Sequence, residues 1–185
     1  MIKNTELAEL LESQNIFEFH SDKEDEGFNV GYLLAYDDDY VLMQQVDDEG
    51  RVSSYLIIRR DADAFIDQTD TYLDNILKLQ KIAKKYETYN LKSDFTLQNN
   101  EKSILLNVLS YLKDSQNVMD YILNDDEYFS FGIIKEISED TVTINDLDEN
   151  LNLVVDKDRK AKIQDINNIE FDGVHELLLT KLIEK

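Results

Sequence analysis

The segment most suggestive of chemistry is Asp146–Asn152, whose acidic and amide residues alternate as they do at the start of a calcium-binding loop. That loop needs glycine at its sixth position and a bidentate glutamate at its twelfth, where this chain has Leu151 and Lys157. The acidic runs at 37–39 and 47–49 also lack a complete ligand pattern. We therefore predict solvated turns, with an opportunistic divalent-ion site as the alternative.

Two residues, His20 and His175, are the only histidines that could act as bases near neutral pH. They have dissimilar neighbours, and we expect both to be surface residues. The chain has 40 carboxylates, so some must lie close together by chance, and the sequence cannot single out an acid–base pair. It contains no glycine-rich phosphate loop, nucleophile elbow, helical metal motif or cysteine. We therefore predict no catalytic, cofactor-binding or metal-binding residue.

The one basic doublet is Arg59-Arg60, which follows an apolar run. Its guanidinium groups could contact a phosphate or an acidic peptide. We favour an edge-strand charge that discourages aggregation.

The net charge of −21 limits the possible partners. Such a surface repels phosphate backbones and anionic membranes, so we expect neither nucleic acid nor membrane as a partner. The charge could serve solubility alone, or the chain could be an acidic decoy for a nucleic-acid-binding surface. Without a signal peptide, a cysteine or an apolar run of about 20 residues, the chain is expected to be soluble and cytoplasmic.

A repeated order of segments is visible at residues 28–79 and again at 129–182. Each stretch has an aromatic–glycine strand, an acidic turn, a second strand, another acidic turn, further strands and an amphipathic helix. The short spacing between strands is typical of small barrels. Gly31 and Gly132 lie inside strands, where glycine marks a bend or a close backbone approach. Gly50 is expected to have a positive φ in its turn, with Asn150 as its counterpart.

Helices are predicted from apolar spacing in three places. A short helix containing Leu7, Leu10 and Leu11 precedes a strand at 16–19, and a second helix runs from about residue 70 to 86. A third follows a cap at Asn99 or Asn100 and includes apolar residues recurring at helical spacing: Ile104, Leu105, Val108, Leu109, Leu112, Val118, Met119 and Ile122.

The stretch Val30-Gly31-Tyr32-Leu33, followed by Asp37, resembles the first signature of Sm-like small β-barrels, and Phe131-Gly132-Ile133-Ile134 resembles it again. Ile58-Arg59 resembles the start of the second signature, although Arg60 replaces its glycine. The resemblance implies barrels at 28–66 and 129–171. It does not extend to RNA binding, because valines (Val41 and Val142) replace the asparagine of the family's RNA pocket. The two-copy plan also resembles uncharacterised proteins of low-GC Gram-positive bacteria, which implies no activity.

The predicted fold class is α+β, with two Sm/SH3-like small β-barrel repeats, each followed by a helix, and a helical segment between them. The corresponding domains are 1–79, 80–124 and 125–185. The favoured function is a non-enzymatic cytoplasmic protein that binds another protein. The alternative is an acidic nucleic-acid mimic that inhibits a DNA- or RNA-binding partner, as an immunity or anti-defence factor would, and a third class is an enzyme with a carboxylate–metal site.

Overall fold

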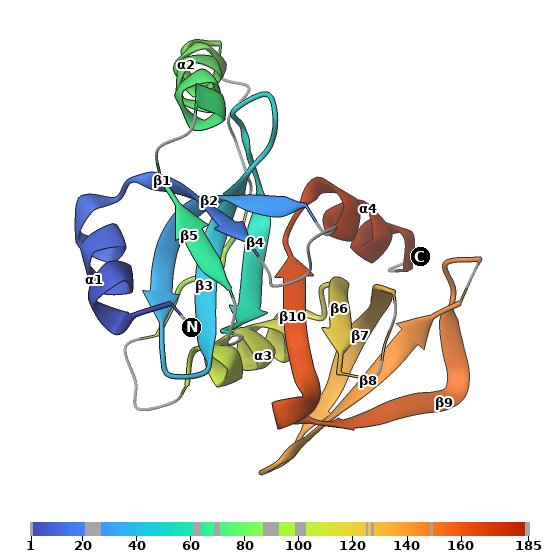
Figure 1. Cartoon of the computed structure of the whole chain (residues 1–185). Coiled ribbons are helices and arrows are strands. Elements are labelled where there is room, and N and C mark those ends of the chain that lie inside the picture. Colours follow the sequence, from blue (N-terminus) through green and yellow to red (C-terminus); the bar gives the residue numbers. More distant parts are fainter. Residues whose placement is uncertain are drawn as a thin grey trace. The chain divides into compact units, whose positions relative to one another are not determined.

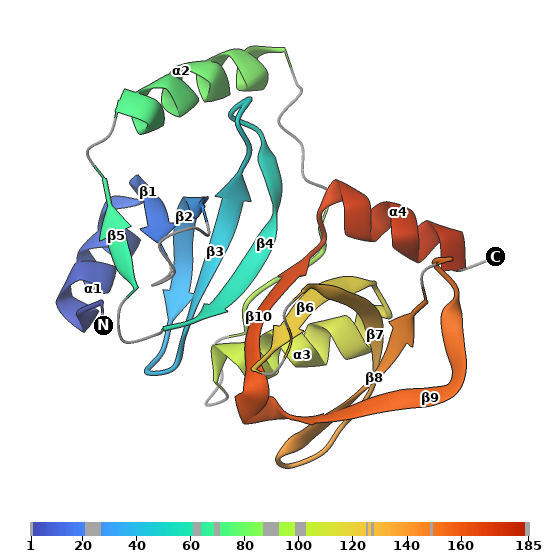
Figure 2. The ribbon, with the colours of Figure 1, turned by 45° about the vertical axis from the view of Figure 1, so that its right-hand side comes forward.

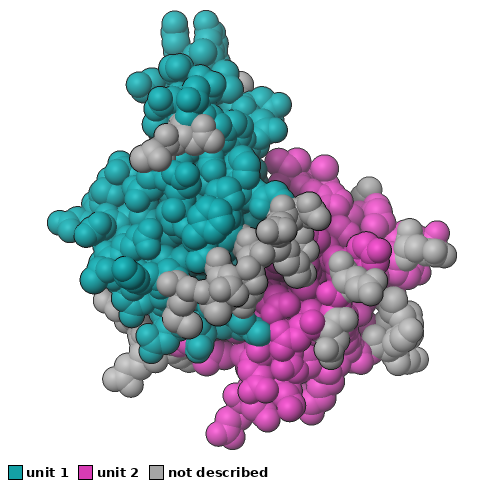
Figure 3. Space-filling model, viewed as in Figure 1, with its two compact units in different colours: residues 1–92 teal, residues 93–185 magenta. Residues whose placement is uncertain are grey.

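The chain divides into two compact units, unit 1 (residues 1–92) and unit 2 (residues 93–185), which are coloured separately in Figure 3. The computed structural model describes residues 2–20, 27–60, 64–68, 71–86, 93–98, 103–124, 126, 128–148 and 150–183, with the backbone alone at 154–157.

Unit 1 is an antiparallel sheet with a helix at each end of its sequence (Figure 1). Its elements are α1 (Asn4–Ser13), β1 (Ile16–His20), β2 (Phe28–Tyr36), β3 (Tyr40–Val46), β4 (Val52–Arg59), β5 (Phe65–Asp67) and α2 (Thr71–Lys85). Their order across the sheet is β5-β1-β2-β3-β4. The predicted first helix, first strand and second helix are therefore confirmed.

The two helices of unit 1 pack on opposite faces of the sheet, because successive residues of a strand point to opposite sides. On one face, Leu7 and Leu10 of α1 join a core with Phe17 and Phe19 of β1. On the other face, Leu73 and Ile76 of α2 join a cluster with β-strand residues Ile16, Val30 and Val46.

The β3–β4 turn approaches α2 closely, as Figure 2 shows. Gly50 in this turn has φ +76°, and a Cβ there would lie 2.4 Å from the backbone nitrogen of Gln80. The Tyr32 hydroxyl donates a hydrogen bond of 2.8 Å to the Gln80 side chain. The turn residue is glycine because both the dihedral angle and the helix backbone leave no room for a side chain.

Unit 2 has the same kinds of element: α3 (Ile104–Ser115), β6 (Met119–Leu123), β7 (Ser130–Ile137), β8 (Thr141–Leu147), β9 (Leu153–Lys162), the short 3₁₀ helix η1 (Ile163–Asp165), β10 (Ile166–Phe171) and α4 (Val174–Ile183). Their order across the sheet is β10-β6-β7-β8-β9. Leu179 of α4 packs with Val118 and Ile133. The apolar side of α3, including Val108, Leu109 and Leu112, is fully buried.

A fully buried carboxylate, Asp172, joins three parts of unit 2. It accepts hydrogen bonds from Ser93, from the Tyr111 hydroxyl at 2.6 Å and from the Asn117 amide at 2.9 Å. Three donors compensate for the lost hydration of this anion. The loop before α4 is thereby tied to α3 and to the start of the unit.

The prediction of two small barrels, and of an internal repeat of such barrels, is wrong. Neither unit closes into a barrel. In unit 1 the last strand, β5, pairs with β1 and not with β4. In unit 2 the last strand, β10, pairs with β6 and not with β9. The alternating apolar pattern fits either architecture. In unit 1, helices on both faces bury the apolar residues without closure of the sheet.

The third predicted helix is too long at both ends. Its N-cap is Ser103, whose hydroxyl accepts from the Leu106 amide, whereas Asn99 and Asn100 lie outside the described residues. The helix ends at Ser115, because Gln116 has a left-handed φ of 56°, and the chain then forms β6. The predicted connector 80–124 contains the end of α2, in unit 1, and α3 and β6, in unit 2.

The strand glycines behave as predicted, since both lie in strands that the neighbouring strand approaches closely. A Cβ on Gly31 would lie 2.2 Å from the Gln44 carbonyl oxygen, and one on Gly132 would lie 2.7 Å from Ile144 Cγ2. The predicted counterpart of Gly50 is wrong, because the left-handed residue of the β8–β9 turn is Leu151, with φ 61°, not Asn150.

Candidate functional site

Helix α4 carries two features that could have a function: a group of ionisable side chains under its first turn and an apolar stripe on its outer side. The first turn follows Gly173, whose carbonyl accepts the Leu177 amide at 3.0 Å. His175 and Glu176 belong to this turn. The two features lie within unit 2.

Three side chains form the carboxylate–histidine cluster: Asp120 of β6 and His175 and Glu176 of α4. One potential ligand atom from each lies within 4.8 Å of the other two. Glu170 of β10 stands directly opposite Asp120 in the antiparallel register, so a third carboxylate borders the cluster. Among the described residues, this is the one group of three such side chains close enough to hold a metal ion together.

Burial and like charges oppose ionisation of Asp120. Burial, then the charges of Glu176 and Glu170, raise the pKa of Asp120 to about 8. Its Oδ1 atom is shielded from solvent and has no hydrogen-bond partner in the described structure. A proton or a cation at this carboxylate would therefore relieve repulsion.

Glu176 is 3% exposed. Its burial raises its pKa, an effect opposed first by a hydrogen bond from its own backbone amide and least by one from Gly173. The charge of Glu170 raises the pKa further, and His175 lowers it. Asp120 and Glu176 thus lie close together, and burial raises the pKa of each.

His175 covers the cluster from the solvent side. Its side chain is 59% exposed, and its Nδ1 lies 3.7 Å from Glu176 Oε1. The edge-to-face contact with Phe131, at 5.1 Å and 88°, orients its ring. Phe131 of β7 is also the register partner of Asp120 of β6, so the aromatic ring that contacts His175 and the carboxylate lie opposite each other on neighbouring strands.

Unit 1 contains a related pair, Glu18 and His20 of β1. Glu18 is 3% exposed, and its Oε2 accepts from His20 Nε2 at 2.9 Å, while its Oε1 has no partner in the described structure. Asp67 of β5 stands opposite Glu18 in the register. The His20 ring stacks on Phe65 at 4.3 Å, which holds the imidazole against the sheet.

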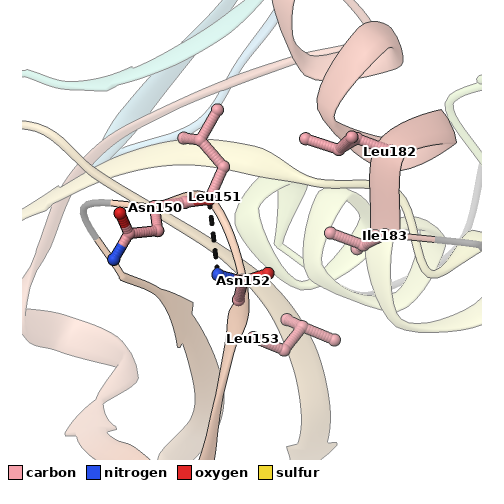
Figure 4. Close-up of a pocket in the computed structure, with 6 residues that line it drawn as sticks. All are labelled: Asn150, Leu151, Asn152, Leu153, Leu182 and Ile183. Atoms are coloured by element: carbon pink, nitrogen blue, oxygen red, sulfur yellow. Dashed lines mark hydrogen bonds between the residues drawn. The ribbon is translucent and has the colours of Figure 1, made fainter.

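The outer side of α4 is an apolar stripe, here called the α4 face: Val174 (70% exposed), Leu178 (65%) and Leu182 (48%). Residues spaced four apart share one side of a helix, so the three side chains are neighbours. Leu182 and Ile183 also line a pocket of about 320 Å³ with residues 150–153 of the β8–β9 turn (Figure 4). Within the β8–β9 turn, Leu151 has the left-handed backbone described above.

The acidic runs serve as turn caps. Asp148 Oδ1 accepts the backbone amides of Asn150 and Asn152 at 2.8 and 2.9 Å. Asp47 Oδ1 accepts those of Glu49 and Arg51 at 3.0 and 2.8 Å. These carboxylates replace missing backbone acceptors, the ordinary use of aspartate in a turn.

The other candidates from the sequence are structural. Arg60 is 7% exposed and donates to the backbone carbonyls of Ile2 and Asp37 and to the Asn4 side chain, so its guanidinium is committed inside unit 1. Val41 and Val142 are fully buried.

Sequence reasoning missed Asp120 and Glu176 and treated His175 as an isolated surface residue. Asp120 was assigned to a helix, and 55 positions separate it from His175. The available signal was the alternating burial expected for Met119, Tyr121 and Leu123, which β6 shows.

None of the described helices combines the length and the apolar character needed to cross a membrane. Comparison with protein-family models, curated proteins and solved structures finds no match to this chain.

Proposed function

We propose that the chain is a non-enzymatic cytoplasmic protein that binds a basic partner protein through the α4 face. The observation that carries the proposal is the exposure of three neighbouring apolar side chains, Val174, Leu178 and Leu182, on a helix whose other side is packed. Burying apolar surface contributes about 25 cal/mol per Å², so covering this stripe would supply much of the binding free energy.

The neighbouring pocket extends the same surface. Leu182 belongs to both the stripe and the pocket wall, opposite Leu151. The left-handed backbone of Leu151 costs about 1–2 kcal/mol, and strained residues of this kind cluster at binding sites. An apolar side chain of the partner could lie between Leu151 and Leu182.

The chemistry of the partner follows from the charge. At a net charge of −21, the chain attracts a positively charged protein and repels a second copy of itself. The proposed partner is therefore a basic protein that presents an apolar groove flanked by lysine or arginine. Complementary charge would raise the association rate, and the stripe would determine the dissociation rate.

The experiment is affinity capture from cytoplasmic extract with wild type, Leu178→Glu and Val174→Glu. A charge placed in the interface should weaken capture at least about tenfold. Ile82→Glu is the matched control, because Ile82 is an exposed apolar residue (53%) on α2 of unit 1. Support requires a basic captured protein, loss of capture in both α4 variants and retention with Ile82→Glu.

Three results would contradict the proposal. Equal capture by wild type and both α4 variants would exclude the α4 face. Salt-resistant dimerisation abolished by Leu178→Glu would identify a second copy of the chain as the occupant. Displacement of the partner by duplex DNA, with no effect of Leu178→Glu, would favour the acidic-decoy alternative.

A further inference from the structure

The carboxylate–histidine cluster of unit 2 combines an imidazole with two carboxylates in one place. Its three ligand atoms, one each from Asp120, His175 and Glu176, lie within 4.8 Å of one another. Ligand atoms bound to one metal at about 2.0–2.2 Å lie at most about 4.4 Å apart. A small movement of the exposed His175 side chain would therefore bring the set to coordination distances.

Asp120 lies close to the carboxylate of Glu176 and opposite that of Glu170. Asp120 Oδ1 is buried without a hydrogen-bond partner in the described structure, and Glu170 adds another carboxylate in the next strand. His175 Nδ1 lies 3.7 Å from Glu176 Oε1, and an imidazole carries charge only when protonated. Buried charges are normally paired or coordinate a metal.

We propose that Asp120, His175 and Glu176 form a binding site for a divalent transition-metal ion. The inference is independent of the partner-binding function, because none of the three ligand residues belongs to the α4 face.

The mixed ligand set indicates the class of ion. Imidazole nitrogen favours Zn²⁺ and its neighbours in the transition series, whereas Mg²⁺ and Ca²⁺ prefer sites made of oxygen ligands. Three protein ligands would leave at least one coordination position for water.

Phe131 and Glu170 surround the ligands. Phe131 contacts the His175 ring edge-to-face and is the register partner of Asp120, so it acts as a positioning residue for the imidazole. Glu170 adds negative charge without belonging to the set of three close ligand atoms, and that charge should strengthen cation binding at low ionic strength.

The experiment is calorimetric titration of the chelator-treated full chain with Zn²⁺, repeated with Mg²⁺ at matched ionic strength. Wild type should bind one equivalent of Zn²⁺ saturably and should not bind Mg²⁺ in the same range. His175→Ala and Asp120→Asn should each weaken Zn²⁺ binding at least about tenfold. Replacing Zn²⁺ with Co²⁺ should give a visible absorption band that His175→Ala removes.

His20→Ala is the matched control. It removes the other histidine, which also pairs with a buried glutamate, and should leave the affinity unchanged. Because His175 is mostly exposed, His175→Ala should fold, which far-ultraviolet circular dichroism can verify. Wild type without saturable Zn²⁺ binding, His175→Ala binding as tightly as wild type, or loss of binding in His20→Ala would each overturn the proposal.

Discussion

Asp120 on β6 and Glu170 on β10 are register partners, so two carboxylates face each other across adjacent antiparallel strands. Like charges in this arrangement destabilise a sheet. Glu18 and Asp67 stand in the same relation on β1 and β5. In each unit the strand after the first helix therefore carries a carboxylate at the point where the last strand joins the sheet.

The stability of the metal-free protein should depend on pH through Asp120. Its folded pKa of about 8 lies above the unfolded value of about 3.9, so between these values the folded state binds more protons. The contribution of Asp120 to the free energy of unfolding should therefore fall as the pH rises from about 4 to 8. Because Glu170, Glu176 and His175 face Asp120, the informative quantity is the stability of wild type minus that of Asp120→Asn.

Urea unfolding in chelator at a series of pH values measures this difference. It should decline through the window and become level above about pH 8. Parallel curves for wild type and Asp120→Asn would show that Asp120 ionises normally in the folded protein.

Replacement of Asp172 by alanine should destabilise unit 2 by about 1–3 kcal/mol, because it removes the acceptor of three partly buried donors. Asp94→Ala removes an exposed carboxylate next to Ser93 and should change stability by less than about 0.5 kcal/mol. Equal denaturant midpoints for the two variants would refute the anchoring role of Asp172.

Valine at either strand glycine should destabilise the fold by about 1–3 kcal/mol. Gly31→Val should be the more harmful, because its Cβ would lie 2.2 Å from the backbone oxygen of Gln44, whereas a Cβ at Gly132 would lie 2.9 Å from the backbone oxygen of Asn145. Denaturant melts compare both with Thr141→Val, a strand position where a β-branched residue fits. Midpoints at or above that of wild type would show that neither strand needs glycine.

Replacement of Leu151 by glycine should raise stability by up to about 1 kcal/mol, because it relieves the left-handed backbone at φ 61°. The same variant should weaken partner capture, because the pocket loses an apolar wall. Thermal melts and capture measure the two effects. A variant that is more stable and binds the partner as well as wild type would remove Leu151 from the proposed interface.

The sequence predicts best those features that depend on residues within one helix or strand. Leu7, Leu10 and Leu11 predicted α1, and the glycines marked the close strand approaches because no other residue tolerates them. The sequence does not predict β6, because Val118, Met119 and Ile122 fit helical spacing as well as they fit a strand. For the same reason the sequence does not identify Asp120. The carboxylate–histidine cluster depends on strand register and on the position of α4, which local spacing does not encode.

The barrel expectation failed for a related reason. Alternating apolar residues and strand bends are properties of neighbouring strands, whereas closure is decided by the last strand. Phe65–Asp67 pairs with β1 and Ile166–Phe171 with β6, and no residue within either segment specifies its partner.

The return of the last strand to the first also has a consequence for the folding reaction. The hairpins β2–β3–β4 and β7–β8–β9 join segments close in sequence, and such contacts form early. The ladders β1–β5 and β6–β10 instead close loops of roughly 50 residues and carry the larger entropy loss. Each of these late ladders contains an acid pair, Glu18–Asp67 or Asp120–Glu170. Charge neutralisation by a proton or a cation should therefore accelerate the final step of folding, which stopped-flow refolding at different pH values can detect.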